Sequence, residues 1–268
     1  MRHLILALAL SGLLAVAPAS AATWKIDDTY VGGGYKTNGP YTQNNGDVIA
    51  AYSQINKFDI DNMIVDIDSL GNVTVTVTTD YNPSDSDIAW LGTQFGDLFI
   101  STDGWNPTGT SPYKADTYVN TGTDWEYVFD TDTGKFYKTN DGAFLLSQDF
   151  HGDRPDSWYR KQQLVQIDED ALTSAPITMG TFEIGTDEAG NNVLTYYGFN
   201  LTDMGLDLAQ TYELAFRWTM TCANDAIEGS LTWQPVPEPE TMVLLGLGLL
   251  GLGAVGRRRL CPVYTKRS

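Results

Sequence analysis

Cysteine and histidine are almost absent from this chain of 268 residues. Its two cysteines are Cys222 and Cys261, and Cys261 lies in the C-terminal tail. With one cysteine left for the body, no intramolecular disulfide framework can form, and Cys222 is expected to be a small buried hydrophobe or, alternatively, to form an intermolecular disulfide. Apart from His3, the only histidine is His151, so a histidine-ligated zinc site or a histidine-based triad has one candidate at most.

Basic residues are also scarce. The chain has 16 Lys and Arg against 34 Asp and Glu, which gives a net charge of −18. Such a surface repels nucleic acid and anionic membranes, so neither is expected as a partner. The same surface favours solubility and attracts divalent cations.

Apolar runs occur only near the two ends. At the N-terminus, Arg2 and His3 precede the run Leu4–Val16, and Ala19-Ser20-Ala21 supplies small residues for cleavage. A charged start, a short apolar stretch and a small-residue site indicate a secretory signal peptide over residues 1–22, removed by signal peptidase after Ala21 or Ala22.

The second apolar run, Met242–Val255, is uncharged and stands between two short motifs. Pro237-Glu238-Pro239 precedes it, and Arg257-Arg258-Arg259 follows. The run is shorter than the about 20 residues that usually span a bilayer, so it spans only with local thinning or snorkelling arginines. Arginines hold the end of such a helix in the cytoplasm, which places everything before it outside the inner membrane.

This tripartite end resembles the PEP-CTERM sorting signal of Gram-negative bacteria. The resemblance implies recognition by an exosortase at the inner membrane, removal of the helix, and release or attachment of the rest at the cell surface. Proteins with this signal usually accompany exopolysaccharide production. The chain departs from the pattern in its tail, residues 260–268, which continues past the arginines.

One domain is expected between the signals, over residues 23–235. Ten of the basic and 32 of the acidic residues lie outside the terminal signals, so this domain carries a charge of −22. In Asn72–Asp80, valines alternate with threonines, which is typical of a strand with one buried face. In Thr211–Met220, Phe216 and Trp218 alternate with Ala215 and Arg217.

Strand patterns of this kind recur between turns that place Asp before Gly, at Asp66–Asn72, Asp130–Gly134 and Gly185–Asn191. The pattern predicts an all-β fold, a single β-sandwich of jelly-roll-like type. Further strands are expected at Phe58–Asp68, Gly96–Ser101, Asp124–Phe129, Lys135–Thr139, Leu164–Ile167, Thr178–Ile184, Val193–Phe199 and Gly229–Trp233, and one short helix at Leu201–Leu208. Substituting Arg217 with Ser is expected to be far milder than placing Asp at Phe216 or Trp218.

Paired aspartates make calcium the one cofactor that the sequence suggests. Asp66 and Asp68, and Asp130 and Asp132, stand in turns and offer the oxygen ligands that hard cations need. None of these turns matches an EF-hand loop. The alternative interpretation is turn chemistry on a solvated acidic face.

Aromatic residues in loops are candidates for sugar binding. Trp90, Trp105, Trp158 and Tyr159 stand in polar segments, where rings flanked by amides and carboxylates stack on sugars. A glycosidase would need two carboxylates around the scissile bond, and no strand motif singles out such a pair. We therefore expect a non-enzymatic structural or adhesive surface protein associated with exopolysaccharide. The alternatives are a calcium-dependent lectin-like module and, less favoured, a polysaccharide hydrolase.

Overall fold

The computed structural model describes residues 22–33, 42–43, 48–49, 57–139, 143–151, 159–235 and 246–250. Ala21–Pro235 forms one compact unit. Of the C-terminal signal only residues 246–250 are described, and they are helical. No helix among the described residues has the length and apolar character needed to cross a membrane. Most of the expected sorting helix, with its proline and arginine motifs, lies outside the described residues.

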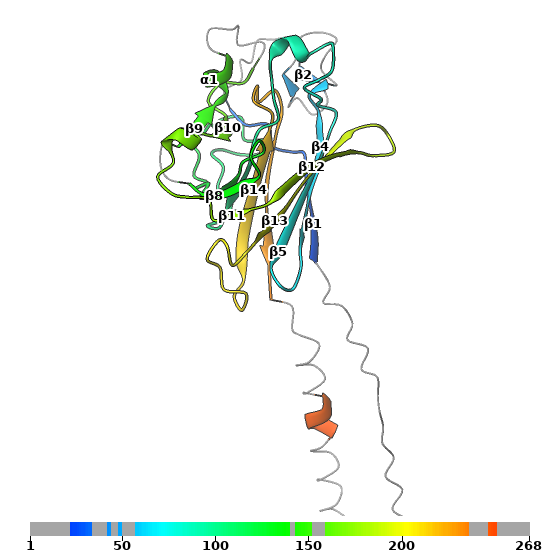
Figure 1. Ribbon diagram of the computed structural model, residues 1–268, viewed down its shortest axis with the longest axis vertical. Coiled ribbons are helices and arrows are strands. Elements are labelled where there is room, and N and C mark those ends of the chain that lie inside the picture. The colour runs from blue at the N-terminus through cyan, green and yellow to red at the C-terminus, as the bar shows by residue number, and fades with distance from the viewer. Residues whose placement is uncertain are drawn as a thin grey trace, which may run out of the picture. The chain divides into compact units, whose positions relative to one another are not determined.

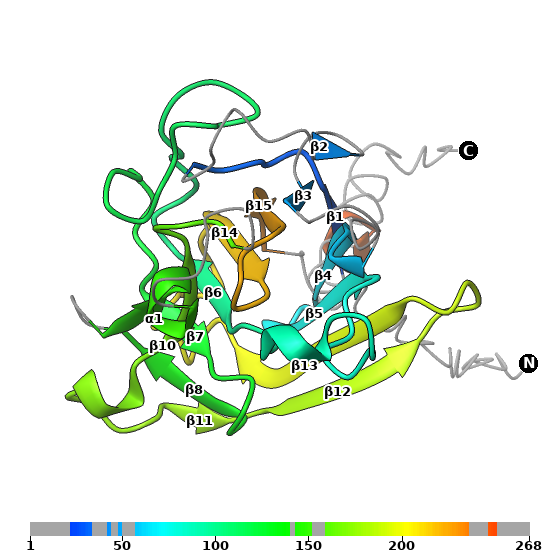
Figure 2. The same cartoon turned by 90° about the horizontal axis from the view of Figure 1, so that it is seen from above.

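The compact unit is built from antiparallel strands, which confirms the predicted all-β class. Two sheets pack face to face as a sandwich (Figures 1 and 2). The first has the order β1-β4-β5-β13-β12, with β1 Ala22–Asp27, β4 Ile60–Ile67, β5 Asn72–Thr79, β13 Asn192–Asn200 and β12 Thr181–Thr186. The second has the order β11-β8-β7-β6-β14-β15, with β11 Thr178–Met179, β8 Lys135–Lys138, β7 Tyr127–Phe129, β6 Leu98–Ser101, β14 Tyr212–Thr219 and β15 Ala226–Trp233.

Two small two-stranded sheets and several short helical turns complete the described part of the compact unit. These sheets pair β2 Thr42–Gln43 with β3 Val48–Ile49, and β9 Phe144–Leu146 with β10 Leu164–Ile167. The helices are α1 Ser147–His151 and the 3-10 turns η2 Ala89–Leu91 and η3 Glu169–Ala171. The Leu201–Leu208 segment forms hydrogen-bonded turns, so the helix expected there is wrong.

The first sheet follows the alternation of its sequence. Along β5, Val73, Val75 and Val77 are buried, whereas the intervening threonines are half-exposed. In the register of β4 and β5, Val65 lies opposite Val75 and Met63 opposite Val77, so one face presents a continuous apolar surface to the core. Turns beginning at Asp68, Asp130 and Asp187 close hairpins, as their Asp-before-Gly patterns predict.

The main core lies between the sheets. Phe216 and Trp218 of β14 are fully buried there, and the Trp218 indole N–H donates to the Tyr196 hydroxyl of β13 at 2.7 Å. The chain passes from the second sheet to the first at Gly180, where a Cβ would lie 2.5 Å from the Tyr197 carbonyl oxygen. Only glycine allows this close crossing.

The second sheet is covered on its other face as well. A smaller apolar cluster packs there, containing Phe99, Trp125, Val128, Tyr137 and Leu164. The hairpin β9–β10 supplies part of this cover. Arg217 is consequently only 2% exposed. The expectation that Arg217→Ser is far milder than a change at Phe216 rested on alternation alone and loses its basis here, because the apolar residues named above cover that side of β14.

Candidate functional site

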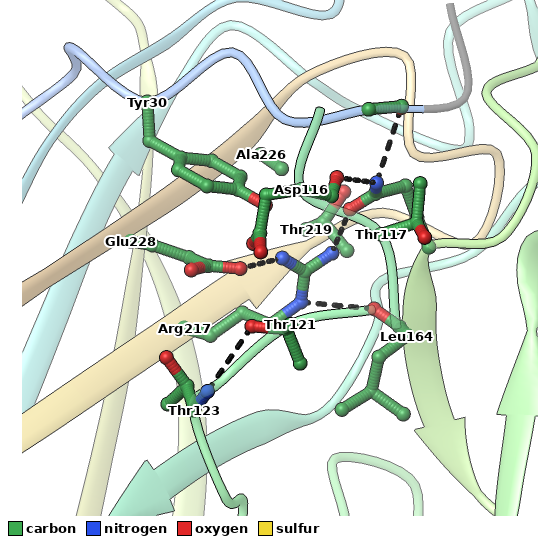
Figure 3. Close-up of polar contacts among 12 residues, drawn as sticks. Tyr30, Asp116, Thr117, Thr121, Thr123, Leu164, Arg217, Thr219, Ala226 and Glu228 are labelled. Carbon is green, nitrogen blue, oxygen red and sulfur yellow. Dashed lines mark hydrogen bonds and ion pairs between the residues drawn. The ribbon is translucent and has the colours of Figure 1, made fainter. Parts of the chain in front are cut away.

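A buried polar cluster surrounds Arg217 on the covered face of the second sheet (Figure 3). Register places Arg217 of β14 opposite Glu228 of β15, and the two side chains form an ion pair in which both are 2% exposed. The guanidinium also donates to the Leu164 carbonyl at 3.1 Å and to the Gln163 side-chain oxygen at 2.8 Å. Three protein acceptors therefore satisfy its planar fork.

The cluster ties together segments that are distant in sequence. The Tyr30 hydroxyl, in the chain after β1, donates to the Asp116 carboxylate at 2.7 Å. The Trp105 indole donates to Glu228 at 3.0 Å. Gln163 donates through its amide to the carbonyls of Gly33 and Asp116. The cavity left among these groups measures about 10 Å³, which leaves room for about one water at most.

Burial dominates the electrostatics of this cluster. Burial raises the pKa of Glu228, while the neighbouring Arg217 opposes that rise. Burial, with Glu228 nearby, also raises the pKa of Tyr30 well above its ordinary value. The charged groups are paired with one another, and no ligand-sized space remains among them. The cluster therefore has a structural role: it holds segments that are distant in sequence together.

A second feature is an acidic pocket of about 280 Å³ at the same sheet. It lies where the start of β6, the β7–β8 turn and the segment after β10 meet. Its lining includes six carboxylates: Asp97, Asp130, Asp132, Asp168, Glu169 and Asp170. Two of the predicted metal ligands, Asp130 and Asp132, therefore lie in one pocket, and Asp97, Glu169 and their neighbours join them through the tertiary fold.

The carboxylates in this pocket differ in their surroundings. Asp97 accepts hydrogen bonds from the backbone N–H groups of Thr131 and Ile167, at 2.9 and 2.8 Å, and burial raises its pKa well above the usual range. Burial also raises the pKa of Asp130. In contrast, Lys135 and then Tyr137 hold the pKa of Glu169 down at about 2. An ionised carboxylate therefore lies beside carboxyl groups whose pKa is raised. A bound hard cation would stabilise the charged form of these groups, and carboxylate oxygens are the ligands that it prefers.

The other predicted pair lies apart from this pocket, at the β4–β5 turn. The Asp68 carboxylate accepts from the backbone N–H groups of Leu70 and Asn72, both at 2.9 Å, and from the Asn72 amide at 2.8 Å. Asp66 accepts from the Thr23 hydroxyl. These contacts are the turn chemistry offered as the alternative interpretation. Asp130 has the same role in its own turn, where it accepts from the backbone of Asp132 and Thr133.

A third acidic group was not anticipated from the sequence. Asp28, Asp59 and Asp225 each place a carboxylate oxygen within 4.8 Å of the others. Asp225 also accepts from the Ile60 N–H at 2.8 Å, which ties this group to the start of β4. The three come from the end of β1, the approach to β4 and the β14–β15 turn. No local spacing could reveal them, because only the pairing of the sheets brings them together.

Comparison with protein families identifies the C-terminal segment. The PEP-CTERM protein-sorting motif matches residues 235–259. This chain carries a PEP-CTERM sorting signal. It is therefore exported across the inner membrane, sorted to the cell surface or secreted, and processed by an exosortase. Pro237, Glu238, Pro239 and Arg257–Arg259 fall within the matched segment. No curated protein and no solved structure matches the chain.

In this PEP-CTERM protein the four aromatic candidates for sugar binding lie in different settings. Trp90, in η2, is 53% exposed, and its indole donates to the Asp87 carbonyl at 2.8 Å. Trp105 is half-buried, and its indole is engaged by Glu228. Tyr159 is 1% exposed, so the expectation of a solvent-facing ring there is wrong: the ring packs in the main core. Trp158 lies outside the described residues.

Proposed function

We propose that the sorted domain is a structural or adhesive component of the cell surface or of an extracellular polysaccharide matrix. The observation that carries this proposal is the PEP-CTERM motif on an exported chain whose segment Ala21–Pro235 forms one compact unit. The buried polar cluster of the described part is satisfied by its own members. Arg217 pairs with Glu228 and lies over the Tyr30 ring, and Tyr30 donates to Asp116. This use of polar groups favours a durable scaffold.

The sorting step supplies the first test. If exosortase reads Pro237-Glu238-Pro239, intact-mass analysis of the protein from the producing cell should give a species without residues 242–256. Glu238→Ala should trap the precursor at the inner membrane, whereas Glu240→Ala, just outside the motif, should not. Full-length protein ending at Ser268 in the wild-type strain and in the Glu240→Ala strain would contradict the proposal.

The matrix role needs its own experiment. The processed protein should co-sediment with exopolysaccharide of the producing strain. A strain that lacks the protein should form a weaker matrix. If co-sedimentation disappears at high salt, the interaction is purely electrostatic. The proposal includes no catalysis, so the same incubation should release no reducing ends. Steady release of reducing ends would favour the hydrolase alternative.

A calcium-dependent lectin-like module is the second candidate. The acidic pocket around Asp130 and Asp132 and the exposed ring of Trp90 favour it. A glycan array read with calcium and with EDTA separates the two candidates, because the lectin should lose its signal in EDTA. Trp90→Ala should also abolish the signal, whereas Trp105→Phe, which keeps a ring in the buried cluster, should not.

A further inference from the structure

The first sheet ends in a strand whose outer edge is open. Among the described strands β12 pairs only with β13, and the hairpin they form projects at the periphery of the sandwich (Figures 1 and 2). Five of its six residues are exposed, and Phe182 is half-buried. β12 contains no lysine, proline or bulge, which are features that usually protect an edge from pairing, and its one charged side chain, Glu183, accepts from the Tyr197 hydroxyl of β13. At the opposite edge, β1 carries an exposed Lys25–Asp27 ion pair.

The hydrogen-bond pattern shows which backbone groups point outward. At the turn, the Asp187 N–H donates to the Asn191 carbonyl at 3.0 Å, so hydrogen-bonded pairs with β13 fall on alternate residues from there: Gly185, Glu183 and Thr181. The N–H and C=O groups of Phe182, Ile184 and Thr186 therefore point away from β13. Gly180, next in that series, donates its N–H to the Gly134 carbonyl, as this alternation requires.

Two of the same three residues, Phe182 and Ile184, carry large apolar side chains. Phe182 and Ile184 lie opposite Tyr196 and Leu194 of β13, on the core side of the sheet. The Phe182 ring still contacts the core, with its centroid 4.9 Å from that of Tyr196. Ile184 lies beyond the cover of the second sheet and is 54% exposed. Free backbone groups and an exposed branched side chain thus coincide on one edge.

We infer that β12 is a homotypic docking edge that pairs with β12 of a second copy of this chain about a two-fold axis. Centring the antiparallel register on Ile184 places Ile184 opposite Ile184 and Phe182 opposite Thr186. All outward N–H and C=O groups of both strands then find partners. On the other face, Glu183 lies opposite Gly185, so no two carboxylates face each other.

Charge favours this register over its neighbours. A centre on Glu183 would set two carboxylates directly opposite, which is destabilising. In the Ile184 register the Glu183 carboxylate stays with its own β13, where it accepts from the Tyr197 hydroxyl at 2.7 Å.

A pairing of this length covers less than the about 1,200–2,000 Å² of a standard stable interface. The dimer is therefore weak and concentration-dependent, and the high charge of both copies opposes it. It forms at the high local density of a surface layer. The inference deepens the proposed structural role and rests on it for its purpose, while the pairing itself depends only on β12.

Sedimentation equilibrium of the processed protein tests the pairing. The mean mass should rise from monomer toward dimer between roughly micromolar and millimolar protein, and more at higher salt, which screens the repulsion. Ile184→Lys, which sets two cations opposite each other, should keep the protein monomeric. Lys25→Ala at the β1 edge is the matched control and should leave association unchanged.

Cross-linking tests the register. Ile184→Cys should form an intermolecular disulfide under mild oxidation, because opposed residues of a hydrogen-bonded pair have Cα atoms about 5.5 Å apart. Thr186→Cys, on the same face, should not, since its two copies would be about 14 Å apart. Wild-type protein that stays monomeric to millimolar, or equal cross-linking of both variants, overturns the inference. Such failure would leave co-sedimentation with exopolysaccharide untouched, so the two proposals fail separately.

Discussion

The two sheets of the sandwich bury their faces differently. The first covers one face and leaves the other partly open, and its strand β5 shows that division in its alternating valines and threonines. The second is covered on both faces, and β14 is buried from Leu214 to Thr219 on both sides. Polar residues on the half-open face of the first sheet, such as Thr76, reach water, whereas polar residues on the covered faces of the second need a protein partner. Arg217 and Glu228 satisfy that requirement by pairing with each other.

The strongest test of this contrast places a charge in the main core. Phe216→Asp should unfold the domain, because losing a buried aromatic costs about 3–5 kcal/mol and the unpaired carboxylate adds to that. Thr76→Asp, on the half-open face of β5, should cost about 1 kcal/mol or less. Circular dichroism with urea titration measures both. A folded Phe216→Asp domain would contradict the packing described for β14.

The covered face of the second sheet should be nearly as sensitive. Arg217→Ser leaves Glu228 buried without its partner, and breaking a buried pair in this way costs about 3–5 kcal/mol. Lys25→Ser, which breaks the exposed Lys25–Asp27 pair of the first sheet, should cost no more than about 1 kcal/mol. Replacing Arg217 and Glu228 together by Met should recover much of the loss. Equal costs for Arg217→Ser and Lys25→Ser in urea would remove the distinction between the sheets.

Calcium should distinguish the acidic pocket of the second sheet from the turn of the first. If the pocket binds the ion, a hundredfold excess over Kd raises the free energy of unfolding by about 2.7 kcal/mol. Asp130→Asn should abolish this gain, whereas Asp66→Asn should keep it. Thermal unfolding in calcium, in magnesium and in sodium chloride of matched ionic strength measures the effect. Equal shifts in calcium and sodium would mean screening without a site.

The smallest effect concerns pH. Lys135 and Tyr137 lower the pKa of Glu169 from 4.5 to about 2, so its contribution to stability is complete above pH 4.5 and is lost as the pH falls toward 2. Glu169→Gln should therefore destabilise the domain at neutral pH, and the gap from wild type should close in acid. Lys135→Met should weaken the same pH dependence. Parallel wild-type and Glu169→Gln curves across that range would contradict the ion pair.

Most strands could be predicted because a half-buried strand alternates in sequence. The predicted Leu164–Ile167 agrees with β10, and the predicted Asn72–Asp80 ends one residue after β5. β1 was missed because it follows the predicted cleavage site directly. The predicted strand Thr178–Ile184 is divided by Gly180 into β11 and β12, which belong to different sheets. A bend that changes the partner of a strand leaves no trace in its alternation.

The candidate sites could be predicted less completely from the sequence than the strands. Asp130 and Asp132 were found through their turn, but Asp97 and Glu169 join them only in space. Asp28, Asp59 and Asp225 come from three separate segments. The aromatic candidates were chosen for their polar neighbours, and Tyr159 shows the limit of that criterion, since a ring in a polar segment can still turn into the core.

The sequence by itself determined the destination of this protein and the all-β class. A sorting signal is read as a linear motif, and strand alternation records local burial, so both can be recognised without the fold. Only the tertiary structure decided that β14 is buried on both faces, that Arg217 meets Glu228, and that β12 keeps an open edge. These features depend on which distant segments pack against which surface. The hydrophobic and electrostatic free energy of that packing arises only in the complete fold, so local sequence does not encode it.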